Sequence, residues 1–383
     1  MHRFLFRSLL PAGLALLAGT VATTACQVYD FEPVTPQAMG QDARSVPLAF
    51  NSPKPNMMLL VDKSGSMGSP VTPPNPPNKI DALKTVMGQF LTDYATVARV
   101  GLSRFPNSSC TPTQASDVLA TIPPNSAGDD DAVLQAASMA ANTALQSLSP
   151  SGGTPTAASL RFTYDNAGEL TDAKREDFVL LLTDGLPNCN NSLDRNTCTC
   201  TSSSSNPCSA NTDCLDKDGT VASVQALKAD KSIRTIVIGF GGDVTGGIAQ
   251  DTLEAMAEAG GFVRKCPNTT DSCGVGNPCV LATALCTKQY FEATDSAALA
   301  AALAEIGSTL TQTACVYNLV DVPSDPLLIS VVVNGTPYLR GDDTWQYDPV
   351  KNQIVFMGAL CDQIRNNTPD NPVRLDIRLL KIL

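Results

Sequence analysis

The chain has 383 residues, of which 37 are acidic and 26 are basic, so its formal net charge is −11 at pH 7. Such an excess of carboxylates repels nucleic acid and anionic lipid, which excludes binding through phosphate contacts. The only histidine in the sequence is His2. Because no other position holds a histidine, a catalytic mechanism with a histidine base beyond residue 2 is excluded as well.

The first 25 residues have the pattern of an export signal. Arg3 and Arg7 supply positive charge, and residues 9–17 form an apolar segment that is too short to span a bilayer. Small residues then precede Cys26. We expect residues 1–25 to be a signal peptide and the mature protein to be exported.

Residues 22–26, Ala-Thr-Thr-Ala-Cys, resemble a bacterial lipobox, with Thr23 where an aliphatic residue is usual. Two outcomes stay open, lipidation of Cys26 or cleavage by an ordinary signal peptidase. Gln27 follows the cysteine in place of Asp, which by resemblance to sorted lipoproteins favours the outer membrane. The residues after it, 26–54, contain several prolines and little periodicity, and we interpret them as a tether.

An apolar run leads directly into a polar turn at residues 59–67, LLVDKSGSM. Asp62, Ser64 and Ser66 alternate along this turn, so one carboxylate and two hydroxyls can converge on one point. Hard oxygen atoms of this kind suit Mg²⁺ or Mn²⁺. The turn is therefore a candidate metal site, with a simple polar loop as the alternative.

The segments that follow alternate between helical and strand patterns, which is typical of a parallel sheet covered by helices. Residues 68–79, GSPVTPPNPPNK, contain five prolines and are predicted to be an exposed loop beside the turn. The other predicted elements are helix 80–94, strand 97–105, helix 132–148, helix 156–164, strand 178–184, strand 233–240, and helices 251–259 and 297–310.

Two of these segments add polar residues near strand ends. Residues 151–155, SGGTP, open a helix and contain Thr154, whereas the buried strand FVLLLT ends next to Asp184. In open α/β sheets, sites form outside the carboxyl ends of strands near a switch point. We therefore expect Asp62, Asp184 and Thr154 to face one another.

Twelve cysteines remain after Cys26, an even number that suits disulfides in an oxidising compartment. We expect Cys110 to pair with a cysteine of the group from Cys189 to Cys214, the four cysteines from Cys266 to Cys286 to pair among themselves, and Cys315 to pair with Cys361, although connectivity cannot be derived from sequence. A thiolate zinc site around Cys198 and Cys200 is the alternative. Along the chain the groups are Cys110; Cys189, Cys198, Cys200, Cys208 and Cys214; Cys266, Cys273, Cys279 and Cys286; Cys315 and Cys361.

The five polar residues match a known pattern, and at this point the chain resembles the von Willebrand factor A family. Its metal-ion-dependent adhesion site reads Asp-x-Ser-x-Ser, then Thr, then Asp usually followed by Gly. The matching positions here are Asp62, Ser64, Ser66, Thr154 and Asp184. The resemblance implies direct metal contacts from Ser64, Ser66 and Thr154, with the two carboxylates holding metal-bound waters or binding the ion themselves.

The resemblance also implies a fold and a domain plan. We expect an α/β domain at residues 55–312, with a doubly wound, mostly parallel sheet and cysteine-rich insertions at about residues 189–214 and 266–286. Short β-rich segments follow, so residues 313–383 are predicted to be a small β-rich domain.

The resulting functional hypothesis is a binding protein, not an enzyme. The implied cofactor is Mg²⁺, or Mn²⁺ or Ca²⁺, and the implied partner is a protein whose acidic residue completes the metal shell. We expect no binding to nucleic acid, and contact with a membrane only through an N-terminal lipid anchor. The expected location is the outer membrane, the periplasm or the cell surface. The alternatives are a structural envelope protein, in which metal and disulfides only stabilise the fold, and a metal-dependent hydrolase. Lys63 is the amine nearest the serines in sequence, but alternation directs it away from them.

Overall fold

The computed structural model describes residues 48–49, 53–72, 75–172, 175–201, 207–266, 272–274, 276–313, 315–319, 321–350, 352–365 and 373–379. The expected signal peptide, Cys26 and the tether up to residue 47 lie outside the described residues. Within the described residues, no helix is both long enough and apolar enough to cross a membrane.

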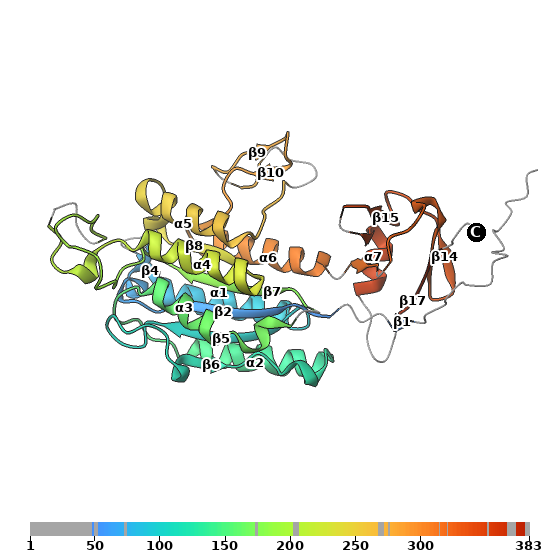
Figure 1. Cartoon of the computed structure of the whole chain (residues 1–383). Helices are drawn as coiled ribbons and strands as arrows, with labels where there is room; N and C mark the ends of the chain where they lie inside the picture. The colour runs from blue at the N-terminus through green and yellow to red at the C-terminus, as the bar shows by residue number, and fades with distance from the viewer. Residues whose placement is uncertain are drawn as a thin grey trace, which may run out of the picture. The chain divides into compact units, whose positions relative to one another are not determined.

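A six-stranded sheet forms the centre of the α/β part, in the order β11-β8-β7-β2-β5-β6 (Figure 1). Neighbouring strands are parallel except β6, which is antiparallel to β5. The predicted mostly parallel α/β fold is thus confirmed. The strands are β2 (Asn56–Asp62), β5 (Arg99–Phe105), β6 (Val118–Ala120), β7 (Asp177–Thr183), β8 (Ile233–Phe240) and β11 (Phe291–Ala293).

Both faces of this sheet are buried because successive side chains of a strand point to opposite faces. In β2, Leu59 and Val61 belong to one apolar core, whereas Leu60 belongs to the other. The first core is completed by α1 (Lys79–Asp93), α2 (Asp131–Gln146) and α6 (Ser296–Thr313). The second is completed by α3 (Thr156–Asp165), α4 (Lys217–Lys231) and α5 (Gly247–Gly260).

Two segments differ from the sequence predictions. Residues 68–79 are not a plain loop, since β3 (Pro70–Thr72) and β4 (Asn75–Asn78) pair as an antiparallel hairpin before α1. Proline is tolerated here because a two-stranded hairpin consists only of edge strands. Helix α4 was not predicted, because its buried stripe is narrow and includes only Thr220, Val224 and Leu227.

A second, smaller unit contains antiparallel sheets and has its own apolar core around Trp345. Its first strand, β1, lies within the expected tether and pairs with β17. Residues 48–49, which the sequence assigns to the tether, thus form a strand of this sheet. The elements are β1 (Leu48–Ala49), β12 (Val316–Asn318), β13 (Ile329–Val333), β14 (Thr336–Tyr338), β15 (Trp345–Asp348), β16 (Gln353–Phe356), α7 (Gly358–Arg365) and β17 (Arg374–Leu379).

Six disulfide bridges join the twelve cysteines after Cys26, and Cys110 pairs with a member of the second group. Bridges of this number are typical of proteins in oxidising compartments outside the cytosol. The pairs are Cys110–Cys189, Cys198–Cys214, Cys200–Cys208, Cys266–Cys279, Cys273–Cys286 and Cys315–Cys361.

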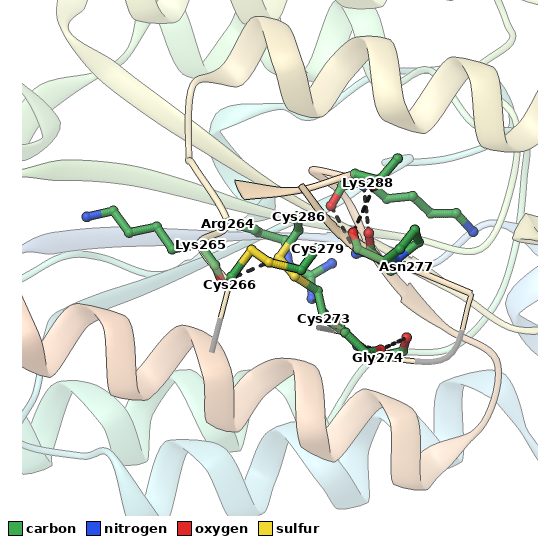
Figure 2. The surroundings of a disulfide bond; sticks show 12 residues. Arg264, Lys265, Cys266, Cys273, Gly274, Asn277, Cys279, Cys286 and Lys288 are labelled. Atoms are coloured by element: carbon green, nitrogen blue, oxygen red, sulfur yellow. Dashed lines mark hydrogen bonds between the residues drawn. A yellow bond between two sulfur atoms is a disulfide. The ribbon is translucent and has the colours of Figure 1, made fainter. Parts of the chain in front are cut away.

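The second cysteine-rich insertion carries β9 (Cys279–Val280) and β10 (Leu285–Cys286), and two disulfides close it. Within it, Lys288 N–H donates to Asn277 Oδ1 at 2.7 Å (Figure 2). Arg264 fixes its base, because the guanidinium donates to both oxygens of Glu305 in α6, at 2.9 and 2.8 Å. A bidentate pair of this kind holds the base of the insertion in one orientation.

At the amino end of the sheet, Asp177 begins β7 and is almost fully buried. Its Oδ1 accepts a hydrogen bond from Asn56 Nδ2 at 2.9 Å. Burial raises the pKa of Asp177 to about 6. Because the folded pKa lies above the unfolded value, this carboxyl lowers stability as pH rises from about 4 through 6.

Replacing Asp177 with Asn is expected to stabilise the protein at pH 7.5, because the buried charge is lost and Asn56 keeps an acceptor. We expect a gain of about 1 kcal/mol, less than the full value of a pKa shift of this size, because Asp177 keeps a small exposed fraction. Urea unfolding at pH 4.5 and 7.5 measures this. The gain should be largest at pH 7.5, and Asp81→Asn on the exposed side of α1 should show no such gain. Equal stability of Asp177→Asn and wild type at pH 7.5 would contradict the argument.

Candidate metal centre

The first part of the site is the turn that ends β2. Asp62 is the last residue of the strand and is inaccessible to solvent. Ser64 N–H donates to Asp62 Oδ1 at 2.7 Å, and Thr183 Oγ1 donates to Asp62 Oδ2 at 2.7 Å. Because both carboxylate oxygens accept hydrogen bonds, the orientation of Asp62 is fixed.

The serine hydroxyls lie between the two strand ends. Ser64 Oγ is 3.0 Å from Ser66 Oγ, and Ser66 Oγ donates to Asp184 Oδ1 at 2.8 Å. Ser64 Oγ lies 3.5 Å from the same carboxylate oxygen. Ser66 belongs to the 3-10 helix η1 (Gly65–Gly68) and is exposed, whereas Ser64 and Asp184 are buried. The oxygen cluster therefore opens to solvent on the side of Ser66.

Backbone hydrogen bonds join the SGGTP loop to this turn. Ser151 N–H donates to Lys63 O at 2.7 Å, and Gly65 N–H donates to Gly152 O at 2.8 Å. Lys63 Nζ also donates to Ser151 Oγ at 2.9 Å, so its side chain is used to hold the loop. These contacts bring Thr154, which is on the same loop, beside the turn.

Thr154 lies beside Gly185, the residue that follows Asp184 in the sequence. A Cβ atom built on Gly185 would lie 3.8 Å from Ser66 Oγ and 4.0 Å from Thr154 Oγ1. Thr154 N–H donates to Asn188 Oδ1 at 2.8 Å, and Asn188 N–H donates back to Thr154 O at 2.9 Å. The structure thus brings all five predicted residues, Asp62, Ser64, Ser66, Thr154 and Asp184, to one end of the sheet.

The Cys110–Cys189 disulfide packs against the loop that carries Thr154. A Cβ atom on Gly153 would lie 2.5 Å from Cys189 Sγ and 3.2 Å from Cys110 Sγ, so only glycine fits there. Gly152 has a φ of +87° and lies against Ser109. The bridge therefore joins the loops after β5 and β7 across the SGGTP loop.

The electrostatics of the site are dominated by two buried carboxylates. Burial, and then the charge of Asp184, raise the pKa of Asp62 to about 7. A third charge compensates, because Lys79 Nζ lies 3.0 Å from Asp184 Oδ2 and both side chains are buried. Sequence reasoning missed Lys79. The one sequence signal for its role was its place in the first turn of a helix, where the helix dipole disfavours a positive charge.

This set of residues fits a divalent cation. It contains three hydroxyl groups and two carboxylates, all hard oxygen donors. Burial first, and then the charge of Asp184, disfavour the charged form of Asp62, and a cation beside it would favour that form. A magnesium ion held here would keep part of its water shell, and an oxygen ligand from outside could replace one of those waters.

A second group of ligand atoms lies in the first insertion, where the sulfur atoms of Cys198, Cys208 and Cys214 are within 4.8 Å of one another. All three belong to disulfides, with Cys214 bound to Cys198 and Cys208 bound to Cys200. A disulfide offers no thiolate to a metal. In the oxidised protein this group therefore serves as a covalent clamp.

No protein-family model matches the sequence, and no curated protein matches it. Among solved structures, the chain is similar to the pilus adhesin SpaC from Lactobacillus rhamnosus GG, with 15% identity, a TM-score of 0.40, and 86% of this chain and 39% of that chain covered. It is similar to the manganese-loaded Plasmodium vivax TRAP protein, with 18% identity, a TM-score of 0.37, and 68% and 75% covered.

A further similarity is to the PilB minor pilin from Streptococcus sanguinis, with 16% identity, a TM-score of 0.41, and 67% of this chain and 61% of that chain covered. The chain thus spans less than half of SpaC and under two thirds of PilB. At these identities and TM-scores, none of the similarities assigns an activity or a ligand to this chain.

Removal of the Cys110–Cys189 bridge is expected to loosen the loop around Thr154 before it unfolds the domain. In the double variant Cys110→Ala/Cys189→Ala, the amides of Gly153 and Thr154 should exchange hydrogen about tenfold faster, because local opening becomes easier by about 1.4 kcal/mol. Hydrogen exchange with mass spectrometry measures this. The control is Cys315→Ala/Cys361→Ala, in the small β unit, which should leave these amides unchanged. Unaltered exchange after loss of the first bridge would show that the loop does not depend on it.

Proposed function

We propose that the protein binds a divalent cation, Mg²⁺ or Mn²⁺, through Ser64, Ser66 and Thr154, with Asp62 and Asp184 beside it. The observation that carries this proposal is the convergence of these oxygens from three separate loops. The hydroxyls of Ser64 and Ser66 contact each other, and both lie within 3.5 Å of Asp184 Oδ1. Such a set of hard donors, opening to solvent on one side, favours a metal site over a simple polar turn.

We propose further that the cation captures a protein partner through an acidic side chain. Neutral hydroxyls donate little charge, so the ion remains electrophilic and attracts a carboxylate in place of water. The exposed position of Ser66 leaves room for such a group from outside. The proposed role is therefore adhesion or another form of protein recognition, in which the partner carboxylate completes the metal shell.

In this proposal the protein acts by binding, without turnover. The amine nearest the serines along the chain, Lys63, is buried and donates to Ser151 Oγ, so it does not serve as a base for them. The six disulfides agree with a cell-surface or other extracytosolic location. Attachment to the outer membrane through a lipid on Cys26 is a further part of the proposal.

Metal binding is tested by titrating the folded domain with Mg²⁺ and Mn²⁺ in a calorimeter. Wild type should bind one ion, and Asp184→Asn or Ser64→Ala should weaken binding at least tenfold, because each removes a donor. Asp216→Asn is the matched control, since Asp216 is a buried carboxylate at the start of α4, outside the site. Equal affinity in wild type and Asp184→Asn would sink the proposed site.

Partner binding is tested by affinity capture from cell-envelope extracts, with Mg²⁺ or with EDTA. A protein retained by wild type only with Mg²⁺, and not by Asp184→Asn, is expected. Treating the extract with a reagent that neutralises carboxylates should abolish this capture. Metal binding that raises the melting temperature, with capture indifferent to EDTA and to Asp184→Asn, would instead favour the structural envelope protein.

The lipid anchor is tested by mass spectrometry of the mature N-terminus and by fractionation of cells that express Cys26→Ser. An acylated Cys26 is expected, and the variant should leave the membrane fraction for the soluble fraction. An unmodified N-terminus beyond residue 26 would rule the anchor out.

A further inference from the structure

A buried lysine lies at the edge of the proposed metal site and is not part of the five-residue pattern. Lys79 is the first residue of α1 and is 1% exposed. The hairpin β3–β4 delivers it there, and its N–H donates to Ser69 O at 2.9 Å. Its side chain lies against Gly241, where a Cβ atom would approach Lys79 Cε to 2.6 Å. Lys79 therefore lies between the ends of β7 and β8.

The ammonium group contacts one particular oxygen of Asp184. Lys79 Nζ donates to Oδ2 at 3.0 Å, whereas Oδ1 accepts from Ser66. Oδ2 thus contacts the lysine, and Oδ1 contacts the hydroxyl cluster. This arrangement turns Oδ1 toward the hydroxyls and leaves the lysine on the far side of the carboxylate.

The balance of charge at the site depends on this contact. Asp62 and Asp184 are both buried, and a buried charge is stable only when it is paired. Lys79 supplies one positive charge, so the group of three carries at most one net negative charge. Lys63, the other buried lysine of this region, donates to Ser151 instead.

We propose that Lys79 is a resident cation that keeps the site assembled without metal and lowers its affinity for divalent ions. This inference rests on the proposed metal-binding function and adds a determinant of its strength. A bound ion meets a site whose negative charge is already reduced, so it binds weakly and retains its need for a further anionic ligand. Because of the lysine, the carboxylate of a partner contributes a larger share of the free energy with which the metal and the partner bind.

The test compares wild type with Lys79→Gln, which keeps a hydrogen-bond donor for Asp184 Oδ2 but removes the charge. Calorimetry with Mg²⁺ alone should show at least tenfold tighter binding by Lys79→Gln. The melting temperature in EDTA should fall, and added Mg²⁺ should raise it by more than in wild type. Lys84→Gln, on the same helix, has the same change in net charge and should match wild type in both measurements.

The double variant Lys79→Gln/Asp184→Asn guards against a purely structural effect. It replaces the ion pair by two neutral amides of similar shape, and its melting temperature in EDTA should exceed that of Lys79→Gln. If Lys79→Gln binds Mg²⁺ as wild type does, or more weakly, the inference is overturned while the proposed function stands. If neither protein binds Mg²⁺, the proposed function fails and the inference fails with it.

Discussion

The parallel pairing of β2 with β7 is the constraint on which the site depends. In this register Val61 lies opposite Leu182, so both strands end at nearly the same level of the sheet. Asp62 and Asp184 are therefore delivered to neighbouring strand ends, where apolar cores on both faces exclude water. A shift of β2 by one residue would move each of its side chains to the opposite face of the sheet, and Asp62 would then point away from its present neighbours.

Burying two carboxylates at adjacent strand ends is unfavourable unless the surroundings compensate, and the contacts around them do so in different ways. Thr183 and the backbone of Ser64 satisfy Asp62, whereas Ser66 and Lys79 satisfy Asp184. Hydrogen bonds to Asp62 favour its charged form, but burial and Asp184 outweigh them, as its raised pKa shows. The site thus combines two buried carboxylates with one lysine, and an added cation would further favour the charged form of Asp62.

Much of this arrangement could be predicted from sequence, because periodic apolar runs define the strands. Strand β8 has the bounds that its continuous run of apolar and β-branched residues predicts, Ile233 to Phe240. The positions of Asp62 and Asp184 then follow, since carboxyl ends of parallel strands share one edge.

The parts that sequence could not predict depend on contacts between distant segments. Nothing local indicates that a strand at Leu48 pairs with one at Leu375, or that the hairpin β3–β4 places Lys79 against Asp184. Helix α4 was missed for a different reason, because its sequence is mostly polar and its buried apolar stripe is short. Long-range pairing and narrow stripes leave weak traces in a single sequence.

The disulfides serve two different purposes that their sequence separations reveal. Four bridges close loops within insertions, with separations of 8 to 16 residues, where polar segments bury little apolar surface. Cys110–Cys189 spans 79 residues and joins loops on both sides of Thr154. With Lys79 in place as well, the hydroxyls and carboxylates are arranged before any ion arrives. A preorganised site loses little conformational entropy on binding, so the proposed binding of a metal and a partner would be adjusted by charge without a change of the fold.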